Sequence, residues 1–90
     1  MAKLLKKEIS SIKKDLINYL KIGNPLISEL KKLPLNKSLL EVGLIDSFGV
    51  IEIVIYIEKK YKIKIKNDEL TKAKFGSINK MVKLIFLKIK

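Results

Sequence analysis

Residues 46–61 read DSFGVIEIVIYIEKKY, and the spacing of their apolar side chains decides how the chain folds. Apolar residues recur at three- and four-residue steps, which is the pattern of an α-helix that buries one face in a core. Asp46 and Ser47 favour a helix N-terminus, so a helix is predicted to begin there and to end near Tyr61. The residues predicted to face the core are Val50, Ile53, Val54, Ile57 and Tyr61.

A second stripe runs along another side of the same predicted helix. It mixes apolar side chains with carboxylates. Exposed apolar groups of this kind mark surfaces that meet other molecules, so we expect this stripe to contact partners. Its members are Phe48, Ile51, Glu52, Ile55 and Glu58.

Helical periodicity also appears at both ends of the chain. The first helix is predicted to end near Gly23, because glycine suits a helix C-terminus and Pro25 cannot continue the helix. Ser77 is predicted to cap the last helix. The core-facing residues are Leu5, Ile9, Ile12, Leu16 and Leu20 in the first of these helices, and Ile78, Met81, Val82, Ile85 and Ile89 in the last.

The segments between the helices are predicted to pack against the core. Residues 24–45 are rich in leucine, and a short helical turn is expected at residues 26–32. Residues 61–66 alternate apolar and charged side chains like a half-buried strand, but no second strand is present to pair with it. We interpret it as an extended connection that buries Ile63 and Ile65.

Length and composition favour a single domain. The 90 residues are 48% hydrophobic, which suffices for one simple core. Residues 67–70 are predicted to open a short third helix. The predicted fold is one all-α domain over residues 1–90, a small four-helix bundle with a long first loop and a short third helix. The longest apolar run, residues 53–57, is far too short to span a membrane, and with no export signal visible we expect a cytoplasmic protein.

The charge is large and unevenly distributed. The net charge is +11, and all 20 basic residues are lysines. Residues 1–33 hold eight Lys and three acids (+5), residues 34–58 one Lys and four acids (−3), and residues 59–90 eleven Lys and two acids (+9). A preference for lysine codons or an anionic partner would each explain the surplus. The acidic island at the start of the central helix is not explained by a codon preference alone.

Missing residue types exclude several classes of function. The chain has no Cys and no His, which excludes zinc sites built from these residues, a cysteine nucleophile, a Ser–His–Asp triad and disulfides. It has no Arg, which excludes bidentate guanidinium recognition of guanine or phosphate. We therefore expect a protein that is not an enzyme, with no catalytic residues and no metal site of its own.

The strongest functional signal lies in residues 39–54, LLEVGLIDSFGVIEIV. The run GLIDSFG at residues 43–49, followed by an apolar helix that carries Glu52, closely resembles the phosphopantetheine attachment motif of acyl carrier proteins. The resemblance covers about residues 35–87 in register. The downstream features that also resemble this family are Tyr61, the alternating residues 61–66, the acidic start of the short helix at residues 68–70, and FGSI at residues 75–78.

The resemblance implies an acyl-carrier-protein-like bundle with a covalent cofactor. Ser47 would carry a 4′-phosphopantetheine arm taken from coenzyme A, and the thiol of that arm would hold an acyl group as a thioester. The negative phosphodiester would lie at the positive end of the helix dipole. Asp46 would help to hold the magnesium ion used by the phosphopantetheinyl transferase, and Gly49 would keep the first turn slim for an approaching enzyme.

The resemblance also implies partners and a pathway. The transferase and an acyl synthase, ligase or ketosynthase would recognise the central helix through Phe48, Ile51, Glu52, Ile55 and Glu58. Alternatively, Ile51 and Ile55 line the core or cover a bound acyl chain. The expected role is that of a monomeric carrier in fatty-acid or specialised secondary-metabolite biosynthesis. The basic charge departs from the family, whose members are typically acidic.

Three alternatives remain open at the level of sequence. Within the same family, the chain could be an aminoacyl or peptidyl carrier. A basic helical nucleic-acid-binding domain would use the lysine-rich ends, although no helix joins a basic face to the Asn, Gln or Arg residues that read base edges. A membrane-surface helix at residues 3–20 would use its lysine-rich polar face.

Overall fold

The computed structural model describes residues 2–89, with the side chains of residues 6–71 and 73–89. The prediction of an all-helical fold is confirmed for these residues, whose radius of gyration of 12.6 Å is that of a compact domain of this length. Within them, no helix is long and apolar enough to cross a membrane. The α-helices are α1 (Ala2–Gly23), α2 (Pro25–Glu29), α3 (Ser47–Tyr61), α4 (Lys72–Phe75) and α5 (Ile78–Ile89), and a 3₁₀ turn, η1, covers Asn67–Glu69.

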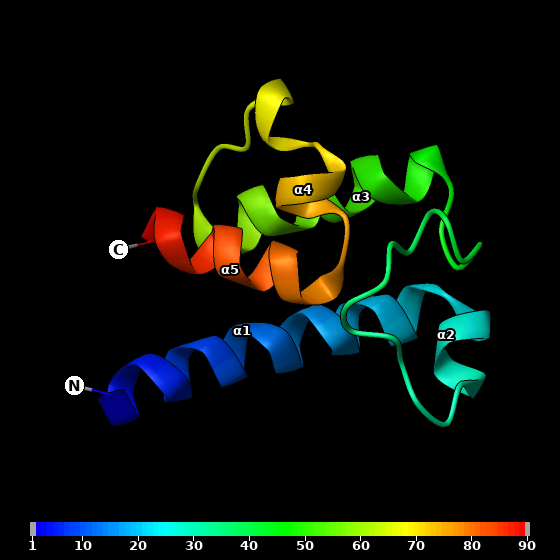
Figure 1. Ribbon diagram of the computed structural model, residues 1–90, viewed down its shortest axis with the longest axis horizontal. Helices are drawn as coiled ribbons and strands as arrows, with labels where there is room; N and C mark the ends of the chain where they lie inside the picture. The colour runs from blue at the N-terminus through cyan, green and yellow to red at the C-terminus, as the bar shows by residue number, and fades with distance from the viewer. Residues whose placement is uncertain (1, 90) are drawn as a thin grey trace.

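Helix α5 is the central element of the fold. It packs against α1, α3 and α4, whereas α2 packs against α1 alone among the closely packed pairs. Figure 1 shows α1 running along one side of the molecule from the N-terminus, with α3 and α5 running back in the opposite direction. The start of α3 therefore lies at the end of the molecule where α2 is found, away from both chain termini (Figure 1).

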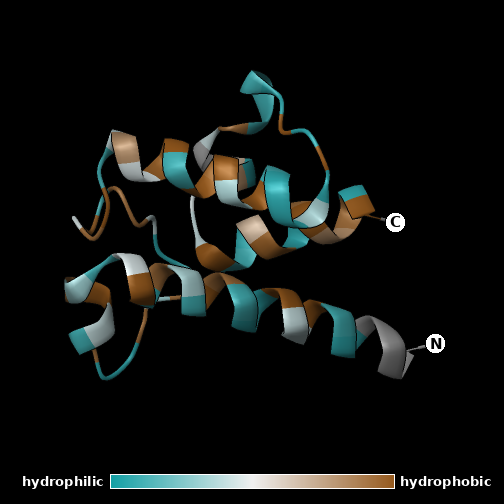
Figure 2. Ribbon diagram, turned by 180° about the vertical axis from the view of Figure 1, so that it is seen from behind, coloured by the Kyte–Doolittle hydropathy of each residue, from teal (hydrophilic) through white to brown (hydrophobic). Residues whose placement is uncertain are grey.

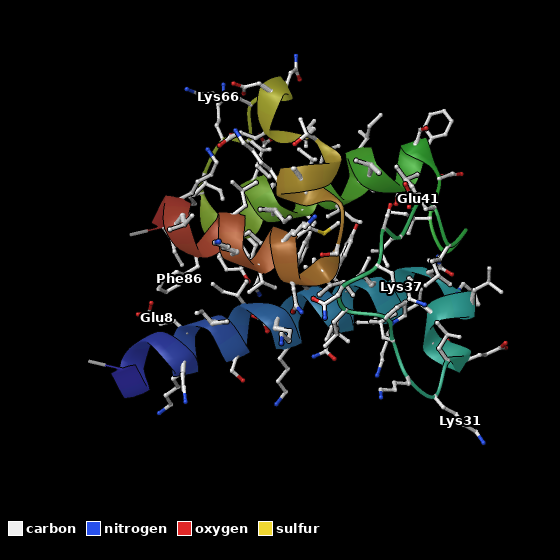
Figure 3. The ribbon with its side chains drawn as sticks, viewed as in Figure 1. Glu8, Lys31, Lys37, Glu41, Lys66 and Phe86 are labelled. Atoms are coloured by element: carbon white, nitrogen blue, oxygen red, sulfur yellow. The ribbon has the colours of Figure 1, made fainter. Side chains whose placement is uncertain are left out.

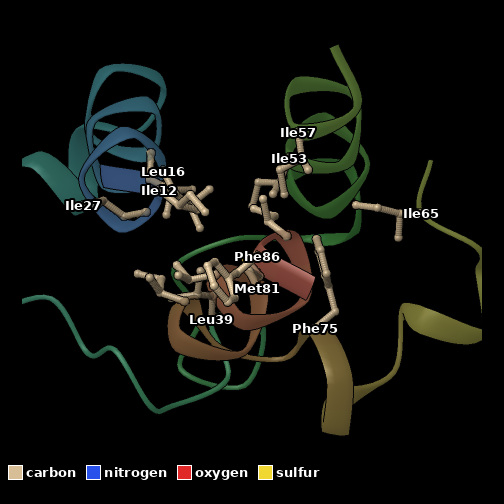
Figure 4. Close-up of a cluster of buried hydrophobic side chains, with 14 residues drawn as sticks. Ile12, Leu16, Ile27, Leu39, Ile53, Ile57, Ile65, Phe75, Met81 and Phe86 are labelled. Carbon is tan, nitrogen blue, oxygen red and sulfur yellow. The ribbon is translucent and has the colours of Figure 1, made fainter. Parts of the chain in front are cut away.

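The core lies between the inward faces of α1, α3 and α5 (Figure 4). The hydropathy colouring of Figure 2 alternates along α1 and α3, as expected for helices with one buried face. The buried residues on the three long helices are Ile12, Leu16 and Leu20 of α1, Ile53 and Ile57 of α3, and Ile78, Met81, Val82, Ile85 and Phe86 of α5; Ile27, Leu39, Ile65 and Phe75 of the shorter segments complete the core.

The predicted core faces are largely confirmed, with differences at the helix ends. Ile9 is 37% exposed, and the side chain of Leu5 lies outside the described residues. In α5, the predicted Ile89 is 39% exposed, whereas Phe86 is buried. Figure 3 shows Phe86 between α5 and α1, where the first helix covers it. Ile89 lies at the last residue of α5 and is not covered in the same way.

Tyrosines join α1 to α3 through contacts that the apolar pattern does not reveal. The rings of Tyr19 and Tyr56 stack with centroids 4.0 Å apart and planes 13° apart. Tyr19 donates its hydroxyl hydrogen bond to the backbone oxygen of Glu52 (3.2 Å), and Tyr56 donates to that of Asp15 (3.2 Å). The hydroxyl of Tyr61 is buried without a hydrogen-bond partner among the described residues, and this burial raises its pKa to about 12.

The connection after α3 follows the sequence prediction in outline. Residues 63–66 are not helical, Ile65 is buried and Ile63 is half-buried. Lys62 ends α3 in the left-handed conformation (φ 55°). No strand forms among residues 2–89, in agreement with the interpretation of this segment as an extended connection.

The short third helix begins later than predicted. Residues 67–69 form the 3₁₀ turn η1, in which the Glu69 carboxylate accepts a hydrogen bond from the Lys66 N–H (2.8 Å). Helix α4 starts only at Lys72, because Thr71 provides its N-terminal cap: the Thr71 hydroxyl oxygen accepts from the Lys74 N–H at 3.2 Å. The hydrogen bond to Glu69 and the cap at Thr71 therefore divide the one predicted helix into two short turns. The predicted cap of α5 is confirmed, since the Ser77 hydroxyl accepts from the Lys80 N–H at 3.3 Å.

Two isoleucines on α3 test the assignment of its two faces. Ile57 is fully buried, whereas Ile55 is 49% exposed. We expect Ile57→Ala to lower the free energy of unfolding by about 2–4 kcal/mol, because it leaves a cavity in the core. The matched variant Ile55→Ala should lower it by no more than about 1 kcal/mol. Chemical denaturation of both variants measures the difference, and equal losses would contradict the assignment.

Candidate functional site

The candidate site is the first turn of α3 and the loop that leads to it. Asp46 is the N-cap of α3, and its Oδ1 accepts a hydrogen bond from the Gly49 N–H at 2.8 Å. The Asp46 backbone oxygen accepts the next N–H, that of Val50, at 3.1 Å. The Val50 contact is the first regular hydrogen bond of the helix, and the Gly49 contact satisfies one of the four N–H groups that every helix leaves without an internal partner at its start. The N–H groups of Ser47 and Phe48 are left at the open end of the helix.

Ser47 is the first residue of α3, and its side chain is exposed. The usual reason for a serine at such a position is capping, in which its oxygen accepts a backbone N–H. Here Asp46 performs that role. The Ser47 hydroxyl forms no hydrogen bond with the described residues, so the stability of the helix start does not account for its presence.

The loop before α3 is anchored to the start of α5. The Leu39 N–H donates to the Gly76 backbone oxygen at 3.3 Å, and the Asn79 N–H donates to that of Leu35 at 3.0 Å. Leu39 is fully buried. Its backbone oxygen accepts from the N–H of Leu44 (3.0 Å) and that of Ile45 (3.3 Å), which closes a turn immediately before Asp46.

Gly43 and Gly49 are needed in this turn for different reasons. Gly43 has a φ of +78°, in the left-handed region that other residues rarely adopt. At Gly49, an added Cβ would lie 3.1 Å from the Cβ of Ile45, closer than an ordinary contact. The structure thus supplies an internal reason for Gly49, the close approach of the loop to the helix, while its predicted role in enzyme access stays a prediction.

Asn24 ties α2 to the same loop, a role that the sequence analysis missed. Its Oδ1 caps α2 by accepting from the N–H groups of Leu26 (2.9 Å) and Ile27 (3.4 Å), and its Nδ2 donates to the Leu44 backbone oxygen at 2.7 Å. An asparagine before Pro25 is a recognisable helix start, so the cap could have been predicted. The bond to Leu44 could not, because it joins residues that are twenty positions apart.

Most of the second stripe of α3 is exposed as predicted. Phe48 is 75% exposed, Ile51 55% and Ile55 49%, and the side chain of Glu52 is exposed as well. In the preceding loop, Leu40 is 48% exposed, which corrects the prediction that the leucines of this segment pack against the core, and Val42 is 44% exposed. Figure 3 shows Glu41 beside the start of α3, so carboxylates and apolar groups gather at this end of the helix.

Glu58 does not belong with the exposed part of the stripe. Its side chain is half-buried, and its carboxylate accepts a hydrogen bond from the Ile65 N–H at 3.0 Å. This bond holds the connection after α3 against the helix. The prediction that Glu58 faces partners with an exposed charge therefore needs correction: its carboxylate is occupied within the fold.

Two hollows lie on either side of the first turns of α3. One, of about 200 Å³, is lined mainly by apolar side chains, including Val50 of α3, Phe75 of α4 and Met81 of α5. The other, of about 380 Å³, lies toward α2 and is lined by polar groups that include Asn24, Asp46 and Glu52. Among the described residues, no group of His, Cys, Asp or Glu side chains is arranged to hold a metal ion.

Comparison with known proteins assigns no family to this arrangement. No protein-family model matches the chain, and no significant match was found among curated proteins or among solved structures.

Asp46 offers a test of how the site is built. Asp46→Ala removes the acceptor for the Gly49 N–H and should lower the free energy of unfolding by about 1 kcal/mol. Asp46→Asn keeps a side-chain oxygen in the same place and should cost only a few tenths of a kcal/mol, since both residues cap helices well. Urea denaturation of the two variants measures this difference. Equal losses would show that the cap does not support the helix start.

Proposed function

We propose that the chain is an acyl-carrier-type protein that bears phosphopantetheine on Ser47. The observation that carries this proposal is the exposed Ser47 hydroxyl at the first residue of α3, next to an aspartate that performs the capping in its place. The surrounding sequence, GLIDSFG, resembles the attachment motif of acyl carrier proteins. The order of elements is consistent with such a bundle, with α2 and η1 as short additions in the two connections.

The helix start suits the product of such a modification. A phosphodiester on Ser47 would place a negative charge at the positive end of a 15-residue helix. It would also lie near the N–H groups of Ser47 and Phe48, which have no acceptor within the helix. The modified state would therefore be stabilised by groups that already exist in the unmodified chain.

The proposed reaction exchanges one phosphorus–oxygen bond for another. The Ser47 oxygen bonds to the phosphorus of coenzyme A that carries pantetheine, and the bond from that phosphorus to the nucleotide half breaks. The nucleotide leaves as adenosine bisphosphate, and the hydroxyl proton is released. The transferase supplies the catalysis, and this chain supplies the acceptor hydroxyl in an accessible place.

Asp46 fits a second role in this reaction. Among the described residues, its Oδ1 accepts from the Gly49 N–H and its other oxygen has no hydrogen-bond partner, and the carboxylate as a whole is exposed beside Ser47. Carboxylate oxygens are preferred ligands of magnesium, which usually takes only one or two of them and keeps several waters. We therefore propose that the Asp46 carboxylate provides a ligand to the magnesium ion that the transferase uses.

The bound arm would present an acyl group as a thioester on the thiol of the cofactor. The apolar hollow beside α3 is a candidate shelter for that group, because Val50, which lines it, lies three residues from Ser47 and therefore close to the same side of the helix. The exposed stripe of Phe48, Ile51, Glu52 and Ile55 would then be the surface read by partner enzymes. Fatty-acid and secondary-metabolite synthesis are the pathways proposed, with an aminoacyl or peptidyl carrier as the alternative within the same class.

The modification of Ser47 is tested by intact-mass spectrometry. Incubation with coenzyme A, magnesium and a broad-specificity phosphopantetheinyl transferase should add the mass of one phosphopantetheine to the chain. Ser47→Ala should abolish the addition, and Ser11→Ala, which removes an exposed serine from α1, should not affect it. Asp46→Asn should slow the addition while leaving the fold intact. Modification that persists in Ser47→Ala would overturn the proposal.

Recognition of α3 is tested by reversing the charge of Glu52. Glu52→Lys should lower the second-order rate constant for loading by the transferase, and the defect should shrink at high salt, because exposed interface charges act mainly on association. Its stability should change by no more than about 0.5 kcal/mol. The control is Glu8→Lys, which makes the same charge change at an exposed position on α1. Equal effects of the two variants on loading would show that only net charge matters.

A further inference from the structure

A second hollow with a different character lies between α4 and α5, outside the site at Ser47. It has a volume of about 350 Å³, and both apolar and charged side chains line it. Figure 1 shows α4 lying alongside α5, and the hollow is formed where the two helices and η1 meet. Its apolar floor is made by Ala73, Leu84 and Leu87, and Lys74, Lys80 and Lys83 stand around it. We call this feature the lysine-ringed groove.

The groove exposes apolar surface that the fold does not use. Leu87 is 57% exposed, although it lies on the helix that makes the centre of the core. Lys80 is followed at three- and four-residue steps by Lys83 and Leu84, and each of these is followed in the same way by Leu87, so the four residues form a stripe on the side of α5 away from the buried residues. Leu84 is half-buried and packs in part against the core, and Leu87 adds exposed apolar surface beside it, so this stripe offers apolar surface that another molecule could cover.

The charge around the groove has a single sign. Residues 70–89 contain five lysines and no acidic residue. The one acid that lines the groove, Glu69, forms an ion pair of 2.8 Å with Lys88, and the hydrogen bond from Lys88 is the main reason that its pKa is lowered. The groove therefore offers a surplus of positive charge around an apolar floor.

We propose that the lysine-ringed groove binds an acidic amphipathic helix of a partner protein. The apolar side of such a helix would cover Leu84 and Leu87, and its carboxylates would pair with the surrounding lysines. Nucleic acid would engage the lysines through its phosphates but would leave the apolar floor uncovered. A flat lipid surface would leave the hollow unfilled. The partner helix is the occupant that uses both the shape and the charge.

This surface is separate from the stripe on α3 that we propose for loading and acyl-transfer enzymes. The two surfaces also differ in sign, because the groove is basic and the α3 stripe belongs to the acidic part of the chain. A partner could then hold the protein by the groove while Ser47 stays accessible. Binding of an acidic partner at the groove would also explain the excess of lysine in residues 59–90, which the carrier role alone does not explain.

The experiment uses the unmodified full chain and a fluorescent probe peptide. The peptide is an acidic amphipathic helix of about four turns, with leucine at positions i, i+3, i+4 and i+7 and glutamate elsewhere. We expect it to bind in a fluorescence-anisotropy titration, with amide NMR shifts concentrated on α4 and α5. A scrambled peptide of the same composition has the same charge and no apolar stripe, and it should bind at least about fivefold more weakly.

Matched variants distinguish binding in the groove from nonspecific attraction of the acidic peptide to the positive net charge of the protein. Lys83→Glu and Leu87→Ser, both at exposed positions in the groove, should each weaken binding of the probe peptide by about fivefold or more. Lys14→Glu makes the same charge change and Ile22→Ser a similar apolar-to-polar change at exposed positions on α1, and each should alter binding less than about twofold. The proposal is overturned if the control variants weaken binding equally, if the scrambled peptide binds as tightly, or if the shifts fall on α3. It is also overturned if a DNA duplex or phosphatidylglycerol vesicles bind more tightly than the peptide and depend on the same two groove residues.

Discussion

The buried stripe of α5 is the contact on which the rest of the structure depends. One helix of twelve residues packs against α1, α3 and α4, so its apolar face is the contact that these three elements share. Side chains such as Met81 and Ile85 are almost fully buried. Each Å² of apolar surface that is removed from water in this way stabilises the fold by roughly 25 cal/mol. In a domain this small, which buries a modest share of its surface, one such shared face suffices to define the fold.

The start of α5 also holds the loop that leads to the candidate site. Hydrogen bonds from Leu39 to Gly76 and from Asn79 to Leu35 attach the loop before α3 to the start of α5, and Asn24 attaches it to α2. Ser47 is therefore exposed yet held on a fixed support, which suits the modification by another enzyme that we propose. Its freedom from capping follows directly from the geometry of Asp46.

The sequence predicted features that depend on local chemistry and missed those that depend on distant contacts. The start and end of α3, its buried Ile53 and Ile57, and the exposed stripe beginning at Phe48 follow from spacing and capping preferences alone. The role of Glu58 could not be predicted, because its partner, the Ile65 N–H, is brought to it only by the path of the chain after α3. The exchange of Ile89 for Phe86 in the core likewise depends on where α1 covers α5.

We propose that Ser47 is modified on a site that is already formed in the unmodified chain. The amide NMR spectrum recorded before and after loading with coenzyme A, magnesium and transferase tests it most directly. We expect shifts confined to the first turn of α3 and the loop of residues 38–45, with the amides in the second half of α5, such as Ile85 and Phe86, unchanged. An unchanged spectrum, or changes spread through α5, would contradict it.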